Sequence, residues 1–115
     1  MSHLSITIRG PQAAAAADQL MSLLSKTFGS GADIVRDSTT DEDAGRLLVP
    51  AAVLAPLDMA DRLERTAKVE AVIKWAEGKA ATGCVVALAA PGETPVDLAR
   101  ASPETVLEAA RAAHG

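Results

Sequence analysis

Four carboxylates are concentrated in the segment RDSTTDEDAG, residues 36–45. Three of them, Asp37, Asp41 and Asp43, could supply the oxygen ligands that calcium and magnesium ions take in proteins. An EF-hand calcium loop, however, needs a glycine at its sixth position and a bidentate glutamate at its twelfth. Counted from either Asp37 or Asp41, neither position has the required residue, so the calcium template fails.

Three interpretations of this acidic segment remain. Asp37, Asp41 and Asp43 could gather a loosely held divalent metal ion, or the segment could present an acidic patch to a basic partner. The third interpretation is a solvated connector between two elements, and it is favoured because connecting segments usually run over the protein surface.

Cys84 is the only cysteine, and His3 and His114 are the only histidines, one near each end of the chain. A nucleophilic cysteine needs a nearby histidine or a helix N-terminus to stabilise its thiolate, and a structural zinc site needs four ligands. We therefore predict that Cys84 is a buried structural thiol, that the histidines are terminal residues without a role, and that the chain has no catalytic residues and no cofactor.

Two further kinds of enzyme site lack their motifs. The segment RGPQAAAA joins a predicted strand to a predicted helix, but it has neither of the phosphate-binding patterns G-x-x-x-x-G-K-[ST] and G-x-G-x-x-G. Its proline also removes a backbone N–H that a phosphate would need. The chain also has no G-x-S-x-G sequence and no histidine in its middle. Nucleotide binding and serine-based hydrolysis are therefore not supported.

The length and charge of the chain narrow its class. Its 115 residues predict a single domain, 1–115, and the net charge of −4 with dispersed basic residues argues against nucleic acid as a partner. No apolar run reaches the roughly 20 residues of a membrane span. The start of the chain does not resemble a signal peptide and no internal disulfide can form, so we expect a cytoplasmic protein that does not enter a membrane.

The first half of the chain predicts a β-α-β order. LSITIRG alternates apolar and polar residues, as a half-buried strand does. A helix with an apolar stripe is expected over residues 12–28, a second strand over ADIVRD, and a third strand over 47–49. Prolines interrupt the next apolar residues, which predicts a buried connection or a short helical turn.

The second half begins with a helix over residues 57–81. Its opposite charges four residues apart predict ion pairs along the helix: Asp58–Arg62, Asp61–Arg65, Glu64–Lys68 and Glu70–Lys74. CVVALAA is expected to be a central strand covered on both faces, APGET a turn, and TPVDLA an edge strand that contains a proline. Ser102 and Pro103 predict the start of a final helix. The fold class is therefore α/β (α+β), with helices packed on a small mixed sheet, a ferredoxin-like β-α-β start, and a C-terminal β-hairpin and helix.

The helix over residues 57–81 has two apolar stripes, although packing on one sheet needs only one. One stripe contains Leu57, Ala60, Leu63, Ala67 and Ala71; the other contains Val69, Val72, Ile73, Ala76 and Ala80, with Trp75 between the two. Either the helix bends near Thr66 or its second half contacts another body. We predict an interface with a protein partner or a second copy, formed by Val69, Val72, Ile73, Trp75 and Ala76.

Several segments together resemble the effector-associated constant component domains of bacterial conflict systems. They are the opening ITIRG strand, the long charged helix, and VVALAAPGETPVDLA running into SPETVLEAA. The chain departs from that family in its acidic loop and in the mixed charge of its long helix. The resemblance implies an adaptor or regulatory role, without catalytic residues to transfer.

We therefore predict a non-enzymatic protein-interaction, adaptor or regulatory module in a bacterial effector or defence system, which forms a homodimer through helix 57–81. The alternative is an inhibitor encoded by a phage or mobile element, which uses its acidic segment to block a basic partner. An enzyme that uses Cys84 or a loop-bound metal ranks third.

Overall fold

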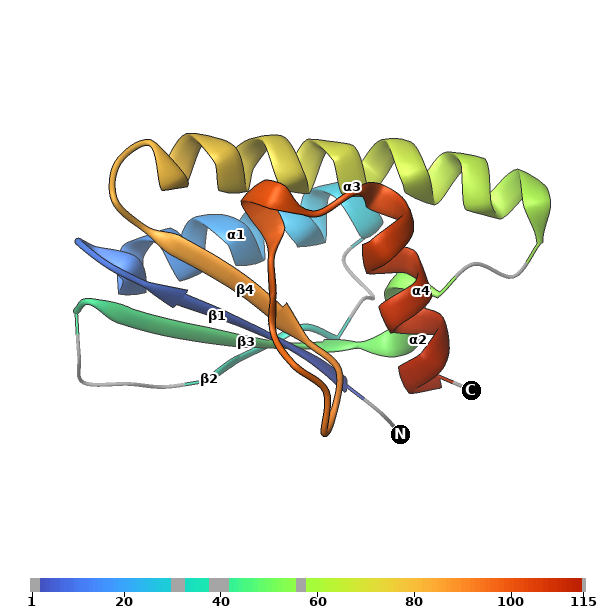
Figure 1. The fold of residues 1–115 in the computed structure, drawn as a ribbon, viewed down its shortest axis with the longest axis horizontal. Helices are drawn as coiled ribbons and strands as arrows, with labels where there is room; N and C mark the ends of the chain where they lie inside the picture. Colours follow the sequence, from blue (N-terminus) through green and yellow to red (C-terminus); the bar gives the residue numbers. More distant parts are fainter. Residues whose placement is uncertain (1–2, 30–32, 38–41, 56–57, 115) are drawn as a thin grey trace.

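The computed structural model describes residues 3–29, 33–37, 42–55 and 58–114, which form a five-stranded sheet with helices on one face (Figure 1). The strands are β1 (His3–Arg9), β2 (Val35–Asp37), β3 (Ala44–Pro50), β4 (Val85–Ala89) and β5 (Val96–Asp97). The helices are α1 (Ala13–Phe28), α2 (Ala51–Leu54), α3 (Met59–Ala80) and α4 (Pro103–His114), with a short 3-10 helix, η1 (Leu98–Arg100), after β5. The predicted α/β class with a C-terminal hairpin and helix is confirmed.

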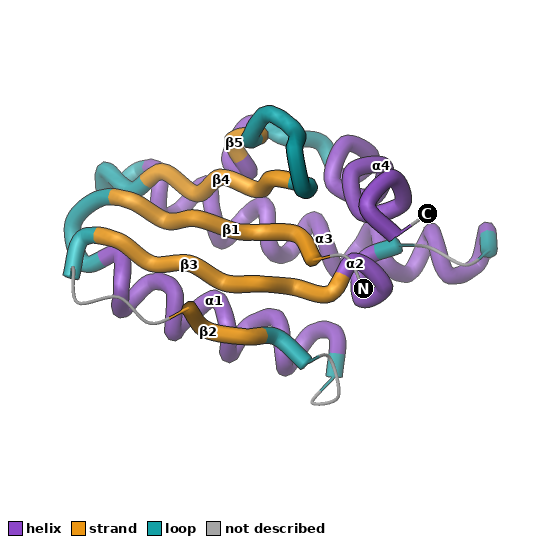
Figure 2. The backbone as a smooth tube through the Cα atoms, turned by 90° about the horizontal axis from the view of Figure 1, so that it is seen from below, coloured by secondary structure: helices purple, strands orange, loops and turns teal. Residues whose placement is uncertain are grey.

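The strands lie in the order β2-β3-β1-β4-β5, a ferredoxin-like arrangement with β5 added at one edge (Figure 2). β1 and β2 are both antiparallel to β3, so they run in the same direction with β3 between them. All described strand pairs are antiparallel, so the sheet is not mixed as predicted. The chain reverses between β2 and β3, and β3 then separates the two strands that the β-α-β start suggested as a parallel pair.

The three long strands have one buried and one accessible face. In β1, Leu4, Ile6 and Ile8 are buried against the helices, while the residues between them are partly accessible. β4 alternates in the same way, and Val85 is 54% exposed. The prediction that β4 is covered on both faces is therefore wrong, because the described helices lie on one side of the sheet only (Figure 1).

Helix α1 packs closely on β3 because small residues meet at the contact. A Cβ atom at Gly45 would lie 2.6 Å from the Cβ of Ala17 and 2.9 Å from the carbonyl oxygen of Ala13. These separations are too short for any side chain at this position. The alanine-rich start of α1 and Gly45 therefore set the distance between helix and sheet together.

Helix α3 reverses the predicted roles of its two stripes. The residues predicted to meet a partner lie in the chain's own core, with Val69, Val72, Ile73 and Ala76 buried. Trp75 is half-buried against that core, and the Lys79 ammonium lies 5.6 Å from its ring centre. The predicted interface is therefore corrected to a core contact. Val and Ile side chains remove more apolar surface from water than the alanine-rich stripe, so the sheet takes the stripe that contains them.

The other α3 stripe, defined here as the α3 outer stripe, faces away from the sheet. It consists of Met59, Ala60, Leu63, Ala67 and Ala71, all exposed, whereas Leu57 lies outside the described residues. The helix is continuous over 22 residues, and its buried and exposed stripes lie on different sides of it.

Local signals at the C-terminal end act as predicted. Gly92 has a φ of 76°, and the Glu93 N–H donates to the Ala90 carbonyl at 3.0 Å, as a type II turn requires. The Ser102 hydroxyl accepts a hydrogen bond from the Thr105 N–H at 3.3 Å, which caps α4. The buried residues of α4 are Val106, Leu107 and Ala110.

Candidate functional site

The described part of the acidic segment contacts the N-terminus of α1. The Gly10 and Ala14 N–H groups donate to the carbonyl oxygens of Asp43 and Glu42 at 3.1 and 3.0 Å. The Gln12 N–H donates to the Asp43 carboxylate at 3.3 Å. Three backbone donors at the start of α1 are thus satisfied, and a carboxylate lies near the positive end of the helix dipole. Residues 42 and 43 therefore support the connector interpretation, with a structural role that spans 31 positions of sequence.

The three predicted metal ligands do not form a described cluster. Asp37 ends β2 and lies 3.5 Å from the Arg46 guanidinium on β3, Asp43 lies beside α1, and Asp41 is outside the described residues. Among the residues that the structure describes, no group of three or more His, Cys, Asp and Glu side chains could hold a metal ion. The metal hypothesis thus stays a prediction that depends on Asp41.

Cys84 is buried, as predicted, and its thiol donates to the carbonyl oxygen of Pro11 at 3.3 Å. It lines a depression of about 230 Å³ together with Gln12, Gln19, Lys79 and Thr82, among others. His3 begins β1, whereas Cys84 lies next to the opposite end of that strand, roughly 20 Å away at 3.4 Å per residue. His114 ends α4. The structure therefore brings neither histidine to the thiol.

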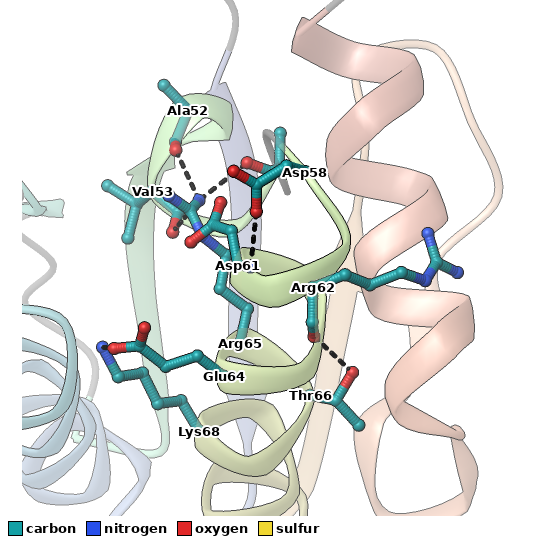
Figure 3. Close-up of polar contacts among 10 residues, drawn as sticks. Ala52, Val53, Asp58, Asp61, Arg62, Glu64, Arg65, Thr66 and Lys68 are labelled. Atoms are coloured by element: carbon teal, nitrogen blue, oxygen red, sulfur yellow. Dashed lines mark hydrogen bonds and ion pairs between the residues drawn. The ribbon is translucent and has the colours of Figure 1, made fainter.

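A cluster of polar contacts joins α2 to α3 (Figure 3). The Arg65 guanidinium donates to the carbonyl oxygens of Ala52, Val53 and Ala55 at 2.9, 2.8 and 2.7 Å. It also pairs with the Asp61 carboxylate at 3.0 Å. A cation at the carbonyl end of a short helix satisfies acceptors that the helix leaves open. This cluster is therefore a structural clamp, and sequence reasoning identified only its Asp61–Arg65 pair.

A neighbouring predicted pair has different partners in the structure. Asp58 caps α3 by accepting the Asp61 N–H at 2.7 Å, while Arg62 pairs with Glu108 of α4 at 3.1 Å instead of with Asp58. The predicted Glu64–Lys68 pair is confirmed at 3.0 Å. The charged side chains near the start of α3 therefore connect this helix to α2 and α4, and they also keep its surface hydrophilic.

The sheet leaves its second face without a helix in the described part of the chain, and we call this surface the open face. Figure 2 views the sheet from that side, with the strands in front of α1 and α3. The strand registers place fourteen side chains there: His3, Ser5, Thr7, Arg9, Val35, Asp37, Ala44, Arg46, Leu48, Pro50, Val85, Ala87, Ala89 and Asp97. Val35 and Val85 are 51% and 54% exposed. Small side chains occupy the centre and charged ones lie around it, which makes a flat surface with an apolar component.

A shallow groove of about 250 Å³ crosses this open face between β1 and β4. Ser5, Thr7, Ala87 and Ala89 form its small-residue floor, with Arg9, Val85 and Pro95 completing the lining. The sequence does not predict this groove, because a continuous apolar run such as CVVALAA is typical of a strand covered on both faces. The alternation in LSITIRG was the available signal, since it marked β1 as covered on one side only.

The α3 outer stripe is the second accessible apolar surface, with Met59 and Leu63 71% and 68% exposed. No helix among the described residues is long and apolar enough to cross a membrane. No protein-family model matches the chain, and no significant match exists among curated proteins or solved structures. The resemblance to conflict-system domains consequently stays a prediction.

Proposed function

We propose that this chain is a non-enzymatic protein-interaction module that binds through the open face of its sheet. The observation that supports this most is the contrast within single strands. Alternate residues of β1 and β4 are fully buried on one side and accessible on the other, where Val85 is more than half exposed. Accessible apolar side chains on a flat, regular surface are typical of protein contact sites.

The open face is favoured over the α3 outer stripe because binding there requires a smaller loss of side-chain conformational entropy. Its central residues Ser5, Thr7, Ala87 and Ala89 lose little side-chain entropy when they are covered, and strands β1 and β4 are hydrogen-bonded on both edges. The most exposed residues of the α3 outer stripe are Met59 and Leu63, which have more rotatable bonds to immobilise.

The setting that we propose is an adaptor or regulator in a bacterial effector or defence system, acting in the cytoplasm. The resemblance of the opening strand, the hairpin and the Ser-Pro-Glu helix start supports the first part. A buried, unpaired Cys84 thiol is compatible with a reducing compartment and supports the second.

The inhibitor alternative has less support from the described carboxylates. Asp37 already pairs with Arg46, and the Asp43 carboxylate already accepts the Gln12 N–H. A basic partner would have to compete with both contacts.

Affinity capture with two matched variants tests the proposal. Ala87→Arg places a long cation in the centre of the open face, and Ala71→Arg places the same side chain on the α3 outer stripe. We expect proteins captured by the wild-type chain from cells that encode it to be lost with Ala87→Arg and retained with Ala71→Arg, measured by quantitative mass spectrometry. Equal capture by both variants, or loss with Ala71→Arg alone, would contradict the proposal.

A further inference from the structure

The charges on the open face are arranged in a way that the net charge of the chain does not reveal. The strand registers align one row across the sheet, which reads Asp37, Arg46, Thr7, Ala87, Asp97 from β2 to β5. The row has a carboxylate at each edge, one guanidinium one strand in from β2, and no charge at the centre. The next row adds Arg9. The open face therefore has equal numbers of carboxylates and guanidinium groups, although the chain as a whole has a net charge of −4.

We propose that the open face packs against the open face of a second copy of this chain, about a two-fold axis parallel to the strands between β1 and β4. This inference rests on the proposed function, which selects the open face, and it names the partner. Such an axis places β1 of one copy over β4 of the other, and β3 over β5. Self-association through one patch on both copies is the commonest form of symmetric assembly.

The axis brings opposite charges together twice. Arg46 of each copy then lies over Asp97 of the other, because β3 and β5 are equally distant from an axis between β1 and β4. An axis through β1 would instead place Asp37 over Asp97, and an axis across the strands through this row would place Arg46 over its own equivalent. Both of those arrangements oppose like charges, which is unfavourable across an interface.

The remaining side chains of the face also fit this axis. Thr7 lies over Ala87 of the second copy, so the two sheets can approach closely at the centre. Arg9 lies over Val85, where its alkyl stem can cover an apolar side chain that is otherwise 54% exposed. Pro95, which follows the turn after β4, would meet Leu48 in the same way.

The size of the face predicts how strong this dimer is. Four overlapping strands about 4.8 Å apart, with three rows of side chains about 6.8 Å apart, cover about 400 Å² on each copy. Stable interfaces bury about 800 Å² on each partner. The dimer should therefore be weak, salt-sensitive and visible only in concentrated solution.

Sedimentation equilibrium of the purified full chain, up to about 1 mM, tests this dimer. We expect a reversible monomer–dimer equilibrium that weakens as salt is added, because the paired charges are screened. Arg46→Glu and Asp97→Lys should each raise the dissociation constant about tenfold or more, since each replaces two attractions by two repulsions. The double variant Arg46→Glu/Asp97→Lys should dimerise more tightly than either single variant, because it restores opposite charges across the interface. It should stay weaker than the wild type, because the new glutamate lies beside Asp37 of its own copy, where the wild type has the Arg46–Asp37 pair.

Two further variants keep the test independent of folding effects. Asp97 also accepts the Ala99 N–H at 3.1 Å, so Asp97→Lys could loosen η1. Ala87→Arg blocks the centre of the face without touching that contact, and it should abolish the dimer, whereas Ala71→Arg should leave it unchanged. Circular dichroism of each variant as a monomer checks that the fold is retained.

Three outcomes overturn the inference: a wild-type chain that is strictly monomeric at about 1 mM, a dimer that survives Ala87→Arg, or a double charge variant no stronger than the single ones. None of these outcomes contradicts the proposed function. A monomeric chain that still loses captured proteins with Ala87→Arg would retain the proposed function and refute pairing with itself.

Discussion

The two faces of the sheet share the same strands and differ in what they contribute. On the helix side, Leu4, Ile6 and Ile8 of β1 are buried in the core, whereas Ser5, Thr7 and Arg9 of the same strand lie on the open face. Because side chains alternate along a strand, one backbone serves both surfaces. The core residues lie on the helix side, so we expect that side chains of the open face can change without loss of the fold. This is why we propose the open face as the binding surface.

The largest expected difference between the faces is in stability. Ile6→Ala removes a fully buried side chain and should lower the free energy of unfolding by about 2–5 kcal/mol. Thr7→Ala, one residue further along β1, should change it by about 0.5 kcal/mol or less. Denaturant unfolding of both variants measures the contrast, and similar losses at the two positions would mean that the open face is also part of the core.

The contact between α1 and the sheet should show the next largest effect. Gly45→Ala places a Cβ against Ala17 and the Ala13 carbonyl and should destabilise the chain by about 1–3 kcal/mol. Gly78→Ala is the matched control, because nothing lies within 4 Å of a Cβ there and an alanine in α3 should stabilise it by about 0.5–1 kcal/mol.

A double-mutant cycle sharpens this second prediction. Ala17→Gly removes the Cβ that lies closest to the new side chain. Gly45→Ala and Ala17→Gly should therefore cost less together than the sum of their separate losses, measured by thermal or denaturant unfolding. Strict additivity would show that the close contact is absent.

The clamp between α2 and α3 should come third. Arg65→Met keeps much of the side-chain volume but leaves three carbonyl acceptors without their donor, at a cost of about 1–3 kcal/mol. Arg62→Met breaks only an exposed pair with Glu108 and should cost about 0–1 kcal/mol. Equal unfolding free energies for the two variants would contradict the structural role of the clamp.

The smallest effect on stability belongs to the open face itself. Val85→Ser should change the free energy of unfolding by about 0.5 kcal/mol or less, because the side chain is already half in water. The same change should weaken self-association several-fold in sedimentation, whereas Leu63→Ser on the α3 outer stripe should not. Weakening by Leu63→Ser alone would transfer the interface to α3.

Much of this architecture follows from local sequence patterns. The alternation in β1, the Pro91-Gly92 turn and the Ser102-Pro103 helix start each depend on a few neighbouring residues, and each was predicted and confirmed. The orientation of α3 could not be predicted from one local pattern, because the helix has two apolar stripes. The stripe with the larger Val and Ile side chains is the buried one. The strand order could not be predicted either, because the partner of each strand depends on where the chain returns to the sheet.

The candidate site was harder to predict than the fold. The open face combines Arg46, Thr7, Ala87 and Asp97 from four strands, and no spacing along the sequence marks them as neighbours. The contact between Asp43 and the start of α1 was equally hidden, because it joins residues far apart in the chain. In both places the register of the sheet creates the arrangement.

Amide chemical shifts measured by NMR as the purified chain is diluted test the central claim most directly. If the open face is the interaction surface, the concentration-dependent changes should occur at Thr7, Arg46 and Ala87, while Leu63 and Ala67 of α3 stay constant. Changes confined to α3, or spectra that do not depend on concentration up to about 1 mM, would contradict an interface between two open faces.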